Sequence, residues 1–222
     1  MRPWLAAGPS LERLNALAAD LEIRTESGKP LHFVPPGAKD AYYEIKVFET
    51  GQVATRPDNL HDWFNALAWL AFPRTKARIN ALHARELPRE QGRRGPLRDL
   101  LTIFDEGGAI VVCADAELVA LLKASRWKAL FWEHRERVAA DMRIVVFGHA
   151  VLEQALAPRP GITCKAIILP GGDLDAGVAQ WLSAQPPGTS PRALVPLPIF
   201  GYPGWHAGQA AAFYEDKRYF RP

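Results

Sequence analysis

Three short apolar runs limit what this chain can fold into. They are GAIVVCA at 108–114, MRIVVF at 142–147 and ITCKAIIL at 162–169. Each is rich in β-branched residues, and stretches with helical periodicity lie between them, which is typical of buried strands alternating with helices. The pattern predicts an α/β or α+β fold, with a small mixed sheet and flanking helices in a single compact domain over residues 1–185.

The segment from Pro186 onward has a different composition. Pro and Gly recur every few residues in PPGTSPRALVPLPIFGYPGW, so regular structure is not expected there. A disordered tail would not be so aromatic. We therefore expect residues 186–222 to form an irregular segment that packs on the same domain through its apolar side chains, which are Leu194, Val195, Leu197, Ile199, Phe200, Tyr202, Trp205, Phe213, Tyr214, Tyr219 and Phe220.

Shorter patterns predict the remaining elements. YYEIKVF, the turn ETG and QVATR (42–56) resemble a β-hairpin with Gly51 in its turn. Asp58 can cap a helix that runs to about Ala71, and Pro73 can begin the next one. A short helix after Pro96 is favoured by helical spacing, although alternation across LTIF leaves a strand as the alternative. Further helices are expected after a cap at Asp115, from Trp127 to about Ala140, in HAVLEQAL (149–156), and from Leu174 to about Ala184.

Cysteine usage and hydropathy suggest a compartment. Cys113 and Cys164 each lie in an apolar run, so buried free thiols and a cytoplasmic location are expected, with one disulfide between them as the alternative. No stretch approaches the roughly 18 consecutive apolar residues of a membrane span. The N-terminal region acquires Glu12, Arg13 and Asp20 before a long apolar core, so we do not interpret it as a signal peptide.

Positive charge is concentrated in one segment. Residues 74–98 hold eight Lys and Arg residues against two Glu residues, a net charge of +6, so the rest of the chain sums to −3 against the total of +3. Arginine predominates there, and its planar guanidinium suits phosphate or carboxylate recognition. The alternative is a solvated helix end followed by an exposed loop.

The helix expected at 60–72 carries polar residues where burial is also expected. At about 100° per residue, one arc holds Leu60, Trp63, Phe64, Leu67, Leu70 and Ala71, which is an ordinary core face. The opposite side combines His61, Asp62 and Asn65 with Trp69 and Phe72. Buried polar groups need partners, since leaving one unpaired costs about 1–3 kcal/mol. These three polar residues therefore either form structural hydrogen bonds or line a cleft.

Three other stretches hold polar groups that could contribute to a site. His149 enters a helix just after a strand, with Glu153 four residues later on the same face, and strand ends of α/β folds are where ligands bind. On the helix after Pro96, Arg98, Thr102 and Asp105 share a face. Asn80 and His83 lie one turn apart on the basic helix, which is suggestive but unspecific. For each of these, a purely structural role is the alternative.

Several common catalytic signatures are absent from the sequence. It has no G-x-G-x-x-G after a strand, no Walker A sequence, no G-x-S-x-G and no C-x-x-C. Both thiols lie within predicted strands, in apolar runs, which disfavours a cysteine nucleophile. Serine is scarce and mostly in loops, so a serine triad has little support.

Four stretches resemble a bacterial family of uncharacterised proteins, domain of unknown function 3025. They are HDWFNALAWLAFPRTKARINALH (61–83), RDLLTIFDE (98–106), FGHAVLE (147–153) and the closing PGW…FYEDKRYFRP (203–222). Together they span most of the chain. The resemblance implies a cytoplasmic bacterial protein without an established activity, and it supplies no catalytic residues.

Three functional hypotheses follow. The leading one is an enzyme, a hydrolase with a divalent metal as one option, acting on a small anionic or phosphorylated substrate. A second is an RNA- or polyanion-binding protein that uses residues 74–98, with Trp69 or Tyr43 as stacking partners. A third is a non-catalytic partner-binding domain. For the enzyme we expect a cleft with catalytic His61, Asp62, Asn65, Asp105, His149 and Glu153, substrate-binding Arg74, Lys76, Arg98 and Trp69, and metal ligands drawn from His61, Asp62 and His149.

Overall fold

The computed structural model describes residues 10–37, 42–90 and 93–221. Its larger sheet has the strand order β4-β3-β5-β6. The central strands β3 and β5 are parallel, while β4 and β6 run antiparallel to their neighbours. The sheet is therefore mixed, and the α/β class predicted from the sequence is confirmed. Its strands are β3 (Gly108–Cys113), β4 (Met142–Val146), β5 (Thr163–Leu169) and β6 (Val195–Pro198).

The two faces of β3 contribute to different hydrophobic cores. Ala109, Val111 and Cys113 pack with the first core, which also contains residues of α7 (Ala116–Lys123) and α8 (Arg135–Asp141). Ile110 packs into the second core. That core also contains residues of α5 (Pro73–Glu86), α6 (Pro96–Gly107) and α10 (Leu174–Ser183). Because both faces are covered, β3 is apolar throughout rather than alternating.

The C-terminal segment packs on the first core, as predicted. Leu197, Phe200, Tyr214 and Phe220 are buried there. The expectation that this segment lacks regular structure is wrong at β6, which pairs with β5 from Val195 to Pro198. Its two prolines are tolerated because β6 lies at the edge of the sheet, where a missing N–H breaks no inner ladder. Three short 3₁₀ turns also lie in this segment: Pro191–Ala193, Ile199–Gly201 and Ala211–Glu215.

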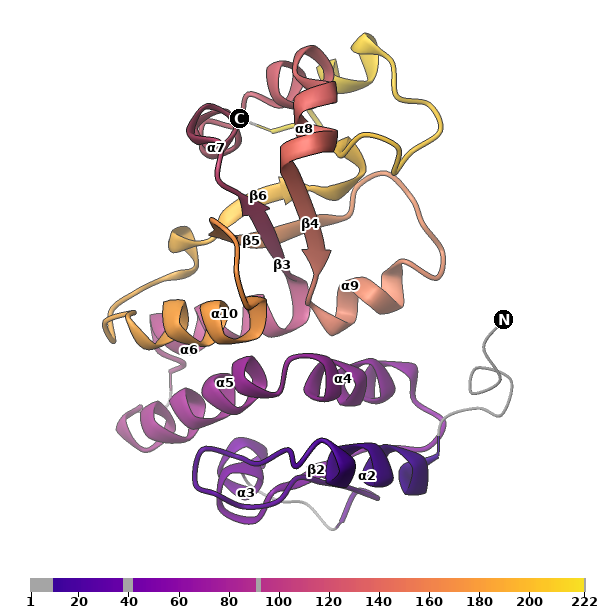
Figure 1. Cartoon of the computed structure of the whole chain (residues 1–222). Coiled ribbons are helices and arrows are strands. Elements are labelled where there is room, and N and C mark those ends of the chain that lie inside the picture. The colour runs from indigo at the N-terminus through magenta and orange to yellow at the C-terminus, as the bar shows by residue number, and fades with distance from the viewer. Residues whose placement is uncertain (1–9, 38–41, 91–92, 222) are drawn as a thin grey trace.

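A second layer lies below the sheet region in Figure 1. It contains α2 (Leu11–Asp20), α3 (Tyr43–Thr50) and a parallel pair of short strands, β1 (His32–Val34) and β2 (Gln52–Ala54). The helices α4 (Leu60–Ala71) and α5 run between this layer and the elements around α6, α9 (His149–Gln154) and α10 (Figure 1). A third core forms here around Phe33, Val53 and Trp69. The predicted boundary at residue 185 stays a prediction.

The hairpin predicted at 42–56 is wrong. Residues Tyr43–Thr50 form α3, and Gly51 ends the helix in the left-handed conformation, with φ of 75°. A Cβ at Gly51 would lie 2.0 Å from the Pro30 carbonyl oxygen, so only glycine fits this position. The strand β2 then pairs with the distant β1 instead of with residues 42–48. A short apolar run fits both periodicities, and tertiary packing decided between them.

Most other element predictions are confirmed, with small shifts. Asn59, not Asp58, caps α4 by accepting a hydrogen bond from the Asp62 amide at 2.9 Å. Pro73 begins α5, and Asp115 caps α7, as expected. The stretch after Pro96 is helical, so its strand alternative is wrong. The helix expected at 127–140 is divided into a π-helical turn, Ala129–Glu133, and α8.

The remaining sequence expectations concern cysteines and membranes. Cys113 and Cys164 are both free and buried, which confirms the thiol interpretation. Within the described parts of the chain, every helix is too short or too polar to cross a bilayer. We predicted that the N-terminal region is not a signal peptide. That region includes residues 1–9, which lie outside the described residues.

Candidate functional site

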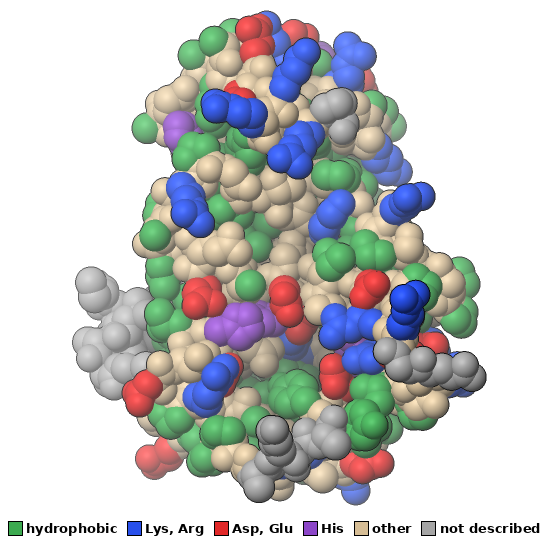
Figure 2. All heavy atoms as spheres, turned by 180° about the vertical axis from the view of Figure 1, so that it is seen from behind, with side chains coloured by type: hydrophobic (Ala, Val, Ile, Leu, Met, Phe, Trp, Pro, Cys, Tyr) green, Lys and Arg blue, Asp and Glu red, His purple; other side chains and the backbone are tan. Residues whose placement is uncertain are grey.

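A pocket of about 470 Å³ lies between the N-terminal layer and the sheet region. Its walls come from α3, α4, α5, α6 and the start of α9. Figure 2 shows histidine side chains on this face, flanked by acidic and basic ones where the surface is hollowed. The polar and charged side chains that line it are Tyr43, Glu44, Arg56, His61, Asp62, Asn65, Lys76, Asn80, His83, Arg94, Thr102, Asp105, Glu106 and His149.

Helix starts and strand ends bring the key side chains together. His61 lies in the first turn of α4, and His149 is the first residue of α9, directly after β4 and a two-residue connection. Gly148 in that connection packs so closely on α6 that a Cβ would lie 2.4 Å from the Glu106 carbonyl oxygen. Lacking a side chain, Gly148 lets α9 approach the C-terminal end of α6, where Asp105 is located.

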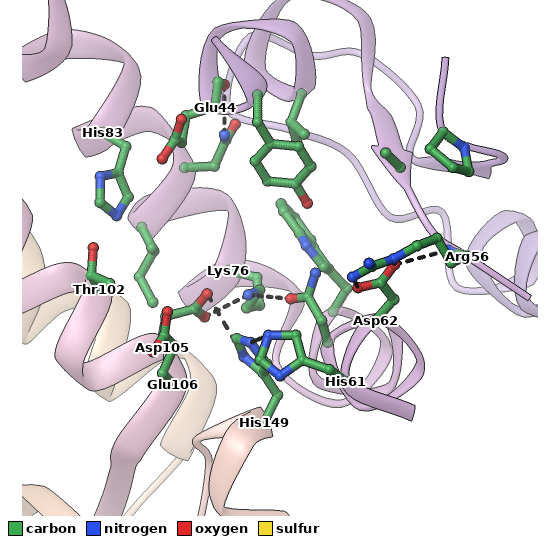
Figure 3. Close-up of a pocket in the computed structure, with 18 of the residues that line it drawn as sticks. Glu44, Arg56, His61, Asp62, Lys76, His83, Thr102, Asp105, Glu106 and His149 are labelled. Atoms are coloured by element: carbon green, nitrogen blue, oxygen red, sulfur yellow. Dashed lines mark hydrogen bonds and ion pairs between the residues drawn. The ribbon is translucent and has the colours of Figure 1, made fainter. Parts of the chain in front are cut away.

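The two histidines are in direct contact. Their Nε2 atoms are 3.1 Å apart, and their rings meet edge to face with centroids 4.5 Å apart. Glu153 Oε2 lies 3.2 Å from the other ring nitrogen of His61, Nδ1. His149 Nδ1 is buried without a hydrogen-bond partner among the described residues and lies 3.9 Å from Asp105 Oδ2. His61, His149 and Asp105 therefore follow one another across the pocket wall (Figure 3), and Glu153 contacts His61 from outside the pocket lining.

The environments of the two imidazoles differ. The His61 side chain is 39% exposed, whereas that of His149 is 6% exposed. Burial lowers the pKa of His149 to about 4, although the nearby Asp105 carboxylate opposes that shift. His149 is therefore neutral near pH 7, because burial disfavours its charged form.

Lys76 connects Asp105 to α4. Its ammonium donates to Asn65 Oδ1 at 2.7 Å and to Asp105 Oδ1 at 2.5 Å, and it lies 5.7 Å from the centre of the Trp69 ring. Burial raises the pKa of Asp105, but the Lys76 charge and its hydrogen bond contribute to a net lowering, so the carboxylate stays ionised. Trp69 is buried at 2% exposure, so it is a wall of the pocket and not the exposed stacking surface considered for RNA.

His83 lies on the side of the pocket away from His61 (Figure 3). Arg98 Nε donates to its Nδ1 at 3.0 Å, and the same guanidinium reaches Glu90 at 2.6 Å and Glu44 at 3.3 Å. Arg98 is itself buried and does not line the pocket. The sequence assigned Arg98 to the substrate. The structure instead places it behind His83, with its donors directed at protein groups.

Two more candidate residues have partners that the sequence did not indicate. Asp62 lines the pocket, but the Arg56 guanidinium holds both of its carboxylate oxygens, at 2.7 and 2.9 Å, and these hydrogen bonds lower the pKa of Asp62. Arg74 lies outside the pocket and pairs with Asp173 at 3.2 Å. Arg74 is therefore not brought to the site, because the start of α5 faces α10.

The metal hypothesis lacks a suitable donor set. No group of three or more His, Cys, Asp or Glu side chains could hold a metal ion among residues 10–37, 42–90 and 93–221. In the candidate set of His61, Asp62 and His149, the carboxylate is already bound by Arg56 on both oxygens.

The basic segment 74–98 is largely neutralised within the fold. Seven of its eight cationic residues lie within 4.0 Å of an acidic side chain, with Arg94 at the limit of that range, so most of the segment's positive charge is paired. These pairs are Arg74–Asp173, Lys76–Asp105, Arg78–Glu26, Arg85–Glu86, Arg89–Glu86, Arg94–Asp99 and Arg98–Glu44.

Several pocket residues were missed or undervalued in the sequence. Glu44 lies on α3, which the sequence suggested to be a strand, so its position could not be anticipated. The spacing of Asn80 and His83 did place both on one face of α5, and both line the pocket. Arg56 and Arg94 lie in connections between elements, where periodicity carries no signal.

Comparison with known proteins places the chain in a family. A family model described as "Protein of unknown function (DUF3025)" matches residues 31–222. The chain belongs to this family. No curated protein and no solved structure shows significant similarity to it. Three of the stretches that resemble the DUF3025 family, at 61–83, 98–106 and 147–153, form α4, α5, α6 and the start of α9, which are the walls of the pocket.

Proposed function

We propose that the pocket is the active site of an acid–base enzyme, a hydrolase that acts on a small polar substrate. One observation carries this proposal: two imidazoles meet through their Nε2 atoms at 3.1 Å in the pocket wall, and a carboxylate holds the far nitrogen of the exposed one. A base that is oriented by a third group is the arrangement that activates water or hydroxyl nucleophiles. The volume of about 470 Å³ suits a small molecule.

When both imidazoles are neutral, one pair of tautomers satisfies both hydrogen bonds. The Glu153 carboxylate only accepts, so His61 donates through Nδ1–H and its Nε2 carries the lone pair. The neutral His149 must then donate through Nε2–H to His61 Nε2. The pocket therefore holds a base, His61 Nε2, paired with a neutral donor, His149 Nε2–H.

The two Nε2 atoms are 3.1 Å apart, so the rings must separate to admit a substrate or water oxygen, which would then use both groups. His61 Nε2 takes the proton from water as the water oxygen bonds to the electrophilic atom, and the same proton then passes to the leaving group. His149 Nε2–H donates a hydrogen bond to the oxygen that gains negative charge. A neutral imidazole serves this role because donating a hydrogen bond does not require it to lose a proton.

Proton uptake by His61 also changes its surroundings. A protonated His61 donates through both nitrogens, through Nδ1–H to Glu153 and through Nε2–H to the leaving group. His149 keeps its proton on Nε2 and continues to donate to the oxygen that gains negative charge. The positive charge that forms on His61 lies beside Glu153, which stabilises it, as the carboxylate of a catalytic triad does.

The test is a hydrolase screen of the purified full chain on small carboxylic esters, amides and phosphoesters. We expect turnover of one class that falls about 10²- to 10⁴-fold in His61→Ala, the usual contribution of a positioned acid–base group. His32→Ala is the matched control, because His32 is an exposed histidine in β1, away from the pocket. No turnover on any class, or unchanged turnover in His61→Ala, would count against the proposal.

Polyanion binding is less well supported. It needs a surface of cations available to phosphates, whereas most cations of residues 74–98 have acidic partners. It also gives no role to the His61–His149 contact.

A further inference from the structure

The pocket has a second group of polar side chains, away from the two histidines in contact. His83 and Thr102 lie on this side (Figure 3). Arg94 lines the same pocket, and its guanidinium donates to Thr102 Oγ1 at 3.3 Å. The proposed acid–base reaction does not use these three residues.

His83 is fixed as a hydrogen-bond donor. Arg98 Nε–H donates to His83 Nδ1, so that nitrogen carries the lone pair and the ring proton is on Nε2. The arginine cannot reverse this polarity, because it has no acceptor and does not lose its proton. Burial lowers the pKa of His83 to about 4, so the ring stays neutral and keeps one donor. No described residue accepts a hydrogen bond from Nε2, and His83 lines the pocket.

Arg94 supplies a cation that is only loosely held. Its closest carboxylate oxygen, on Asp99, is 4.0 Å away, and both side chains are 48% exposed. By contrast, Arg56 in the same pocket holds Asp62 through two hydrogen bonds. Arg94 can therefore turn to a ligand without leaving a buried charge behind. Thr102 accepts from Arg94 and still has its own O–H to donate.

We infer that His83, Thr102 and Arg94 form a carboxylate-binding subsite, which rests on the proposed function and names its substrate as a small carboxylic acid derivative. The three groups offer only donors to a ligand, and the guanidinium fork matches the two oxygens of a carboxylate. A phosphate dianion fits less well, because Glu44, Asp105 and Glu106 line the same pocket and repel added negative charge.

Arg98 has a positioning role in this subsite. It touches no ligand but sets the tautomer of His83, and Glu90 and Glu44 hold its guanidinium in place. Arg98, which we expected from the sequence to bind the substrate, would therefore affect the ligand only through His83.

The experiment measures binding by ¹⁵N-histidine NMR on the full chain, titrated separately with acetate, succinate and inorganic phosphate. In the free protein His83 should give the spectrum of an Nε2–H tautomer. Succinate or acetate should shift the His83 signals, and Arg94→Ala should weaken that binding about tenfold or more. Arg93→Ala is the matched control, because Arg93 is an exposed neighbouring arginine that does not line this pocket.

The outcomes separate this inference from the proposed function. His61→Ala should keep carboxylate binding while losing turnover, so a failed hydrolase screen does not remove the subsite. Carboxylates that leave His83 unshifted, an Arg94→Ala variant that binds like the parent protein, or phosphate that binds more tightly than either carboxylate would overturn the inference. An Nδ1–H tautomer of His83 in the free protein would overturn the role of Arg98.

Discussion

His83 and His149 are two buried histidines in one pocket that have opposite hydrogen-bonding situations. Burial lowers the pKa of each to about 4. Arg98 holds His83 Nδ1 at 3.0 Å, so the proton of that ring has one position. His149 Nδ1 has no hydrogen-bond partner among the described residues, and its Nε2 meets a second imidazole that can give or accept a proton. A ring whose one donor faces the pocket is suited to binding a ligand, and a ring that donates beside a general base is suited to stabilising the reacting oxygen.

The largest expected effect separates the two rings by kinetics. His149→Ala should lower kcat by about 10²- to 10³-fold, because the donor to the reacting oxygen is lost. His83→Gln should raise KM and leave kcat nearly unchanged, because it weakens binding in ground and transition states alike. Steady-state kinetics on the substrate found in the screen measures both. Equal losses of kcat in the two variants would remove the distinction.

The next effect concerns the support behind His83. Arg98→Met should lower the free energy of unfolding by about 3–5 kcal/mol, because it leaves Glu44 and Glu90 without their buried partner. Arg74→Met should cost about 0–1 kcal/mol, because the Arg74–Asp173 pair is well exposed. Urea unfolding measures both variants. A similar cost for the two would show that the Arg98 network is not a buried structural support.

The pH dependence of stability is the third effect. A histidine whose pKa falls from 6.5 unfolded to about 4 folded stabilises the protein fully above pH 6.5 and loses that contribution as the pH falls toward 4. Protonation of each of the two rings should therefore lower the free energy of unfolding by about 2 kcal/mol between about pH 7.5 and pH 5. His149→Gln should remove about half of this slope in urea unfolding experiments. A slope that His149→Gln leaves unchanged would mean that His149 is not buried in its neutral form.

The smallest effect tests the carboxylate behind His61. Glu153→Gln keeps a hydrogen-bond acceptor for His61 Nδ1 but removes the charge, so kcat should fall about tenfold, or about 1.4 kcal/mol. Glu153 is 43% exposed, which limits the effect through solvent screening. The same kinetic assay measures it, with the unfolding free energy as a control for folding. If the Glu153→Gln variant is as active as the parent protein, catalysis by His61 does not require the Glu153 carboxylate.

Much of the fold was predictable because buried elements need apolar side chains, and runs of such residues are visible in the sequence. The strands β3, β4 and β5 were predicted as apolar runs, since a strand covered on both faces needs apolar side chains throughout. The helix α3 and the strand β6 were not predicted. Residues 42–48 fit a strand as well as a helix, and the prolines of β6 argue against a strand unless its edge position is known.

The candidate site was predictable only in part. His61, Asp62 and Asn65 were predicted as site residues because they are polar residues on a helix that we expected to be buried on two sides. All three line the pocket. Which acid meets which base could not be predicted. Asp62 is bound by Arg56, while Glu153 reaches His61 from 92 positions along the chain.

The sequence by itself determined the strand-forming runs, the helix starts at Pro73, Pro96 and Asp115, and the presence of polar groups in apolar surroundings. These features depend on local periodicity and capping, which neighbouring residues express directly. The tertiary structure alone decided that His61 meets His149, that Arg98 faces His83 and that residues 74–98 find acidic partners. Such contacts join side chains on separate elements, and their pairing follows from how the layers pack, which no local pattern encodes.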